Sequence, residues 1–256
     1  MTSEAVAPSP LDIVRVIRRT YDLAKVDFGA KFAIAALLVG LPSAFGDFLQ
    51  ARSLGDDWRA QFSPTVLFVV LLTVLTTTIM QVALLRSAAR QMAGEASPLG
   101  ENLAFGLRLF LPALGFSILA GLAIACGLVA LIVPGVMLAC AWCVGLPALV
   151  LEGTGVMGAF SRSAELTRGS RWRIFGLFAA ILGIIIVAAI VLGLTVGLVG
   201  AVLSLFGGAA ALGAVLNGLF TAVITVFAAT ASAVLYDELR NRPPRSAVQE
   251  IVDILR

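Results

Sequence analysis

Long stretches without a charged side chain alternate along the chain with short segments that carry charges. No Asp, Glu, Lys or Arg occurs in residues 32–46, 60–85, 109–151 and 174–235. About 20 consecutive apolar residues suffice for a helix to cross the hydrocarbon core of a bilayer, and the two longest stretches have room for two such helices each. The pattern therefore predicts an all-α membrane protein and excludes water-soluble fold classes.

Two glycine-containing pairs divide the long stretches, and the division gives six transmembrane helices. Pro134-Gly135 predicts a tight turn, because proline disfavours helix in the residue before it and glycine accepts unusual dihedral angles. A broken helix that lines a site is the alternative interpretation of this pair. Gly207-Gly208 divides the last stretch, and Gly40 and Pro42 bend the first span. The predicted spans are Lys31–Leu49, Pro64–Leu85, Leu109–Val133, Val136–Leu151, Ile174–Phe206 and Leu212–Leu235, of which the fifth is longer than a bilayer requires.

Residues 11–28 have the periodicity of an amphipathic helix. At 100° per residue, one narrow face collects a set of mainly apolar side chains: Ile13, Val14, Ile17, Tyr21, Ala24 and Phe28. Arg15 and Arg19 fall on the opposite face. This pattern is typical of a helix that lies in the membrane interface and directs basic side chains towards anionic lipid headgroups. A soluble helix packed on a partner is the alternative.

The distribution of basic residues predicts the orientation in the membrane. With six spans, sixteen of the eighteen Lys and Arg residues fall on one side, in residues 1–31, 86–108, 152–173 and 236–256. Arg52 and Arg59 fall on the other side. Since cytoplasmic loops of membrane proteins are enriched in Lys and Arg, both termini are expected in the cytoplasm.

The spans group into three similar units within one membrane domain. Residues 11–85, 97–151 and 153–235 each begin with a charged amphipathic stretch and continue as two spans. We therefore expect three helical hairpins, each preceded by a cytoplasmic amphipathic interfacial helix, with flexible ends at 1–10 and 241–256. Gly193, Gly197 and Gly200 offer a surface for close packing against a neighbouring helix or another subunit.

Composition excludes several kinds of chemistry. The chain is 60% hydrophobic and 13% charged, and it has no histidine, so histidine-based acid–base catalysis and most zinc sites are excluded. Cys140 and Cys143 form a CxxC pattern inside an apolar stretch, where small packing residues are favoured over a redox or metal site. The net charge of +3 is spread beside the spans and does not indicate nucleic-acid binding. We expect no cofactor and no metal.

The order of motifs from Leu131 to Arg240 resembles a known family. These motifs are Ile132-Val133-Pro134-Gly135-Val136, Pro147-Ala148-Leu149-Val150-Leu151-Glu152-Gly153, Ala159-Phe160-Ser161-Arg162-Ser163-Ala164-Glu165-Leu166-Thr167-Arg168-Gly169, Arg171-Trp172-Arg173 and Tyr236-Asp237-Glu238-Leu239-Arg240. In this order the chain is similar to the membrane domain of glycerophosphoryl diester phosphodiesterases and to the YciC-like bacterial inner-membrane proteins. The resemblance implies a membrane domain located in the bacterial inner membrane. It does not imply phosphodiesterase activity, because that chemistry belongs to a soluble barrel that uses histidines and metal-binding carboxylates.

Glu152 is a candidate for a structural ion pair. It ends span four, where a carboxylate opposes the helix dipole, and arginines follow in the next segment. We expect Arg162 or Arg168 to bind Glu152 and to hold the following amphipathic helix against the span. A solvated Glu152 and a catalytic or proton-relay carboxylate are the alternatives.

A polar stripe on span six is the second candidate site. Asn217, Thr221, Thr225, Ser232 and Tyr236 share one face, and Thr73, Thr77 and Gln81 share a face of span two. Polar side chains avoid lipid when a neighbouring helix can satisfy them, so both stripes should point inward. We interpret them as helix packing by hydrogen bonds; the alternative is a polar cavity or substrate path.

The sequence contains no recognisable catalytic constellation. We expect a non-enzymatic membrane protein that is a scaffold or modulator of membrane or envelope proteins, in contact with anionic headgroups and with a membrane-protein partner or a second copy of itself. A transporter or lipid-handling protein that uses the two polar stripes is the alternative. An enzyme acting on lipid headgroups, with Glu152 or Glu165, is the third.

Overall fold

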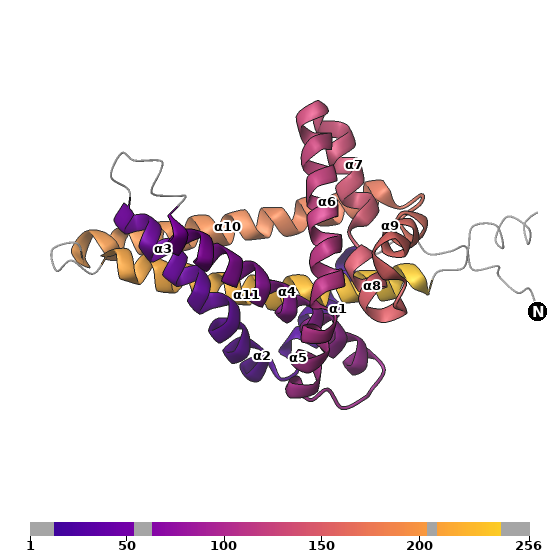
Figure 1. The fold of residues 1–256 in the computed structure, drawn as a ribbon, viewed down its shortest axis with the longest axis horizontal. Helices are drawn as coiled ribbons and strands as arrows, with labels where there is room; N and C mark the ends of the chain where they lie inside the picture. The colour runs from indigo at the N-terminus through magenta and orange to yellow at the C-terminus, as the bar shows by residue number, and fades with distance from the viewer. Residues whose placement is uncertain (1–12, 54–62, 204–208, 242–256) are drawn as a thin grey trace, which may run out of the picture.

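The fold was obtained as a computed structural model that describes residues 13–53, 63–203 and 209–241. The regular structure in these ranges is entirely helical (Figure 1). The elements are α1 (Ile13–Lys25), α2 (Phe28–Ala35), the π-helical turn η1 (Ala36–Gly40), α3 (Leu41–Ser53), α4 (Pro64–Met92), α5 (Leu99–Arg108), α6 (Phe110–Ala130), α7 (Ile132–Trp142), α8 (Gly145–Glu152), α9 (Gly155–Leu166), α10 (Arg171–Leu203) and α11 (Ala209–Arg240).

Six segments of the described chain are long and apolar enough to cross a membrane, which confirms the predicted number. They are Phe28–Gln50, Pro64–Met92, Phe110–Ala130, Ile132–Glu152, Arg171–Val199 and Ala211–Arg240. The first is built from α2, η1 and α3, and its π-helical turn ends at Gly40, beside the predicted bend. The protein is therefore a multi-pass helical membrane protein.

The predicted turn at Pro134-Gly135 is wrong. The chain turns at Leu131, which is extended (φ −161°, ψ 135°), and both residues of the pair lie in the first turn of α7. Proline is tolerated there because the amide hydrogens of a first helical turn have no partner within the helix. Gly135 instead lets α6 approach closely, since a Cβ atom at this position would lie 2.5 Å from Cγ of Leu128.

The fifth span is as long as predicted. The 33 residues of α10 correspond to about 50 Å of helix, well beyond the roughly 30 Å of a bilayer core. The predicted turn at Gly207-Gly208 lies outside the described residues, as do the ends 1–10 and 242–256.

Helix α11 is the central element of the fold. It contributes to all three clusters of buried apolar residues: Leu235 packs with α1 and α10, Ala233 with α4 and α6, and Ala222 with η1 and α4. In the first half of α11 the backbone touches that of the first span, because a Cβ atom at Gly40 would lie 2.9 Å from the carbonyl oxygen of Gly218.

The pair α6–α7 runs in a different direction from the other long helices. In Figure 1, α3, α4, α10 and α11 extend towards the same end of the molecule, whereas α6 and α7 lie side by side and stand across them. The link into this pair is Leu109, and the pair leaves through the short segment between α7 and α8. The fold therefore consists of a four-helix part centred on α11 and a projecting α6–α7 pair.

The amphipathic stretch at the start of the chain forms α1, which ends three residues before the end of the predicted helix 11–28. It ends at Lys25, and Asp27 adopts a left-handed conformation (φ 54°) before α2 begins. The orientation predicted for its basic face differs from the structure. Arg19 binds Asp237 at 3.3 Å and Glu238 at 3.5 Å, and Arg15 lies 3.8 Å from Glu238, so both guanidinium groups bind α11 carboxylates.

Candidate functional site

Four side chains from three helices meet where α8, α9 and α11 come together; we call them the α8–α9–α11 junction. Glu152 ends α8, Arg162 and Glu165 belong to α9, and Tyr236 lies near the end of α11. The guanidinium Nε of Arg162 donates to both carboxylate oxygens of Glu152, at 3.1 and 2.9 Å. Its second nitrogen donates to Glu165 at 3.1 Å. The junction connects segments that are up to 84 positions apart in the sequence.

The end of α8 explains why Glu152 has a cationic partner. Gly153 adopts the left-handed conformation that caps the helix (φ 66°), so Glu152 occupies the last turn, where carbonyl groups give a partial negative charge. A carboxylate at this position is destabilised by the helix and stabilised by a nearby cation. Arg162 supplies that charge from α9, as the sequence predicts.

Tyr236 completes the junction from the central helix. Its ring is 1% exposed, and its phenol donates a short hydrogen bond to Oε1 of Glu152. Burying a phenol without a partner would cost about 1–3 kcal/mol, so this bond makes the burial of Tyr236 possible. The sequence placed Tyr236 on the polar stripe of span six but gave no sign that its partner is Glu152.

Arg162 binds two carboxylates and Arg168 binds none within the described part of the chain. Partial burial alone would lower the pKa of Arg162, but hydrogen bonds to Glu152 and Glu165 raise the pKa above its ordinary value. Arg168 is exposed. Both carboxylates that the sequence offered for catalysis are thus engaged by one arginine.

A polar cleft of about 330 Å³ lies between α3, α4 and α11. Thr73 of the span-two stripe and Asn217 and Thr221 of the span-six stripe line it, together with Asp47. The amide nitrogen of Asn217 donates to the Asp47 carboxylate at 2.6 Å. The two polar stripes therefore do approach each other, at one end of the helices.

The threonines of the stripe bond mainly within their own helix. Thr221 donates to the carbonyl of Asn217 at 2.9 Å, and Thr225 donates to that of Thr221 at 2.8 Å. Thr73 bonds to the carbonyl of Val69 in the same manner. The prediction of hydrogen bonds between helices is therefore wrong for these three hydroxyls, and it is confirmed for Asn217.

Lys31 is a buried polar residue that the sequence did not single out. It is 1% exposed, and its ammonium donates to the side chain of Gln91 at 3.0 Å and to the carbonyl of Leu23 at 3.3 Å. Lys31 thereby joins α2 to both α1 and α4. The available signal was a lysine directly before an apolar stretch, which is also the ordinary mark of a span boundary.

The cysteines of the CxxC pattern are free thiols in a packed region. Cys140 is 2% exposed and belongs to the core cluster of α1, α10 and α11. Cys143 points its sulfur at the carbonyl of Cys140, 3.2 Å away. Both positions agree with small packing residues.

One family model matches nearly half of the chain. Neither a curated protein nor a solved structure matches the chain. The match lies in the segment that the sequence motifs indicated and includes α7 to α10, together with the junction residues Glu152, Arg162, Glu165 and Tyr236. Residues 117–239 match the family described as the membrane domain of glycerophosphoryl diester phosphodiesterase.

Proposed function

We propose that this chain is a non-enzymatic protein of the bacterial inner membrane that acts as a scaffold or modulator of other membrane or envelope proteins. The observation that carries the proposal is the α8–α9–α11 junction. Glu152 at the end of α8 accepts hydrogen bonds from Arg162 of α9 and from Tyr236 of α11, so this carboxylate joins three helices. Glu165 binds the same arginine from within α9. A catalytic carboxylate has to face a substrate, whereas Glu152 is held by donors from two neighbouring helices.

The proposal includes three hairpins with both termini in the cytoplasm. The short helices α1, α5 and α9 precede the first, third and fifth spans, as the three-unit interpretation requires. Ion pairs of α1 with α11 and of α9 with α8 support a set of short helices bound to the ends of spans. In this arrangement the short helices form the face available to a partner.

Transport through the polar cleft is the second candidate function, and the pairing of Asp47 with Asn217 is the observation in its favour. The cleft does not continue along α11. Ala222 directly follows Thr221, and Val226 lies between one and two turns further along. Both are fully buried against Val39 and the rest of that apolar cluster. A transport path would have to open this cluster.

The two functions predict different results when the cleft loses the Thr221 hydroxyl or the Asp47 charge. We would express Thr221→Val and Asp47→Asn in a strain that lacks the protein, and measure membrane insertion, thermal stability and resistance to envelope-active detergents. A scaffold predicts that both variants complement. Arg162→Glu, which breaks the junction, should fail to complement while remaining in the membrane. Loss of complementation by a stable Thr221→Val protein would favour transport, and complementation by Arg162→Glu would reject the junction as the functional element.

A further inference from the structure

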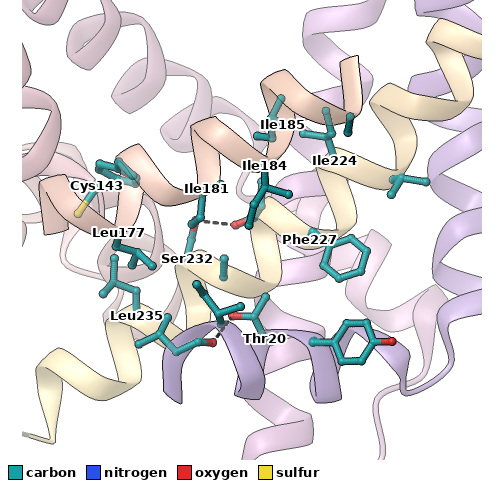
Figure 2. Close-up of a pocket in the computed structure, with 18 of the residues that line it drawn as sticks. Thr20, Cys143, Leu177, Ile181, Ile184, Ile185, Ile224, Phe227, Ser232 and Leu235 are labelled. Carbon is teal, nitrogen blue, oxygen red and sulfur yellow. Dashed lines mark hydrogen bonds between the residues drawn. The ribbon is translucent and has the colours of Figure 1, made fainter. Parts of the chain in front are cut away.

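An apolar groove of about 400 Å³ runs between α10 and α11 (Figure 2). Helix α1 lies along one side, near Thr20 and Leu235, and Ile184 and Ile224 line the far part. The groove is open to the surroundings of the protein, since the Ile184 side chain is 60% exposed. In a bilayer this opening faces lipid.

The walls of the groove offer no free hydrogen-bonding hydroxyl from Thr20 or Ser232. The hydroxyl of Thr20 donates to the carbonyl of Val16, and that of Ser232 donates to the carbonyl of Ala228, each at 2.8 Å. Most other lining side chains are aliphatic or phenylalanine. An occupant of these walls must therefore be apolar along its length.

The dimensions of the groove fit a lipid chain. On α11 the lining residues run from Phe220 to Leu235, which is about 22 Å of helix, and on α10 from Leu177 to Ala188, about 16 Å. One leaflet of a bilayer core is about 15 Å thick, half of the total. The groove is therefore long enough for one acyl chain.

The ammonium group of Lys25 places a positive charge where α1 meets the groove. Tyr21 lines the groove, and the ammonium of Lys25 lies 4.0 Å from the centre of its ring. Arg15 and Arg19 are neutralised by the carboxylates of α11, and Asp22 is an exposed neighbour on α1. Lys25 is exposed and so can bind a phosphate at the surface of the membrane.

We propose that this groove binds one acyl chain of an anionic phospholipid, with the lipid phosphate held by Lys25 beside Tyr21. The acyl chain lies between α10 and α11, and Lys25 of α1 binds the lipid headgroup. The site does not depend on the scaffold function, because it uses other residues than the α8–α9–α11 junction.

Native mass spectrometry of the full-length protein tests the site. Delipidated protein would be mixed with equal amounts of phosphatidylglycerol and phosphatidylcholine, and the retained lipids counted. The wild type should retain one phosphatidylglycerol in preference. Ala231→Phe fills the groove, so this variant should no longer retain the lipid. Ala125→Phe adds the same side chain at an exposed position of α6 and should still retain the lipid.

A rim variant separates recognition of the head from binding of the chain. Lys25→Gln should lose about a fivefold preference for phosphatidylglycerol and still retain phosphatidylcholine, since one basic residue at an anionic surface contributes about 1 kcal/mol. Arg108→Gln, an exposed arginine on α5, is the matched control and should keep the preference. Equal retention of both lipids by the wild type would overturn the headgroup assignment.

A measurement on the wild type covers the case in which Ala231→Phe does not fold. Phosphatidylglycerol with a photoreactive group at the end of its acyl chain should crosslink near Ile184 and Ile224. Crosslinks confined to α6 and α7 would overturn the proposal. A dimer that excludes lipid and crosslinks between two copies at α10 would also overturn it, because a second copy would then occupy the groove.

Discussion

The bond between Glu152 and Arg162 is the residue-scale contact with the clearest energetic consequence. Both side chains are partly exposed, at 22% and 33%, so solvent screens their attraction. Glu152→Gln should therefore lower the free energy of unfolding in detergent by about 1 kcal/mol. Arg162→Gln should lower the free energy of unfolding less in the Glu152→Gln variant than in the wild type, because the ion pair is already broken in that variant.

The control for this cycle is Arg168→Gln, which removes an exposed arginine of the neighbouring segment. It should leave the free energy of unfolding unchanged with or without Glu152→Gln. Strict additivity of the Glu152 and Arg162 substitutions would show that the pair contributes nothing to stability.

Gly218 tests the close approach of the first span to α11. Alanine favours helix over glycine by about 1 kcal/mol, so Gly→Ala at an open helical position should be neutral or stabilising. At Gly218 a Cβ atom would lie 2.9 Å from Cβ of Ala44 and closer still to the Gly40 carbonyl. Gly218→Ala should therefore destabilise the protein by about 1–3 kcal/mol.

Gly193 provides the comparison, since a Cβ atom there meets nothing within 4 Å. Thermal unfolding in detergent should separate the two variants, with a lower Tm for Gly218→Ala and an equal or higher Tm for Gly193→Ala. Equal melting temperatures would mean that the backbones of Gly40 and Gly218 do not touch.

At the scale of elements, α1 is held to α11 by charge. Arg19→Asp should repel Asp237 and Glu238 and expose α1 to limited proteolysis, whereas Arg19→Asp combined with Asp237→Arg should restore protection in part. Arg18→Asp makes the same change at an exposed neighbour on α1 and should leave proteolysis as in the wild type. If Arg19→Asp is cut no faster than the wild type, α1 is held by apolar packing alone.

The same helix marks the limit of prediction from the sequence. The lengths of the apolar stretches predicted six spans, because the requirement to cross a bilayer acts on each stretch locally. Periodicity predicted two faces for α1, but it could not say that the basic face meets carboxylates of α11 more than 200 residues later. Such a partner depends on how distant helices pack, which a local pattern does not contain.

Pro134 and Glu152 show the same limit within one segment. A proline both disfavours helix before it and fits the first turn of a helix, so Pro134 indicated a boundary and left its position open by a few residues. Glu152 was predictable as a paired residue because its place at a helix end is local. Tyr236 as its second partner was not, because that contact spans 84 positions.

At the scale of the whole molecule, the direction of α6 and α7 determines how the chain crosses the membrane. These two helices stand across α10 and α11 in Figure 1. If α10 and α11 cross the bilayer, α6 and α7 would therefore lie parallel to the membrane plane, unless the pair rotates about Leu109. Both helices are apolar on all sides: Leu111, Leu122 and Ile132 are among their exposed residues. The apolar surface of the pair is therefore compatible with helices that cross the membrane and with helices that lie within its plane.

The basic residues before α6 and those after α8 are expected on the same side of the membrane. This requires either that α6 and the α7–α8 segment both cross the membrane or that neither crosses it. Six spans place Leu131, the turn of this pair, at the outer surface; four spans leave it in hydrocarbon. We expect Leu131→Cys, in a protein without Cys126, Cys140 and Cys143, to react with an impermeant thiol reagent applied to intact cells.

Glu165→Cys on α9 is the partner measurement, and it should react only after the cells are made permeable. Reaction at position 165 from outside would reverse the orientation that sixteen basic residues predict. Position 131 separates the two placements of the pair, because a thiol in hydrocarbon does not ionise and stays unreactive from both sides. Unreactive Leu131→Cys beside correctly oriented Glu165→Cys would therefore establish four crossings, with α6 and α7 lying within the membrane, and would contradict six spans.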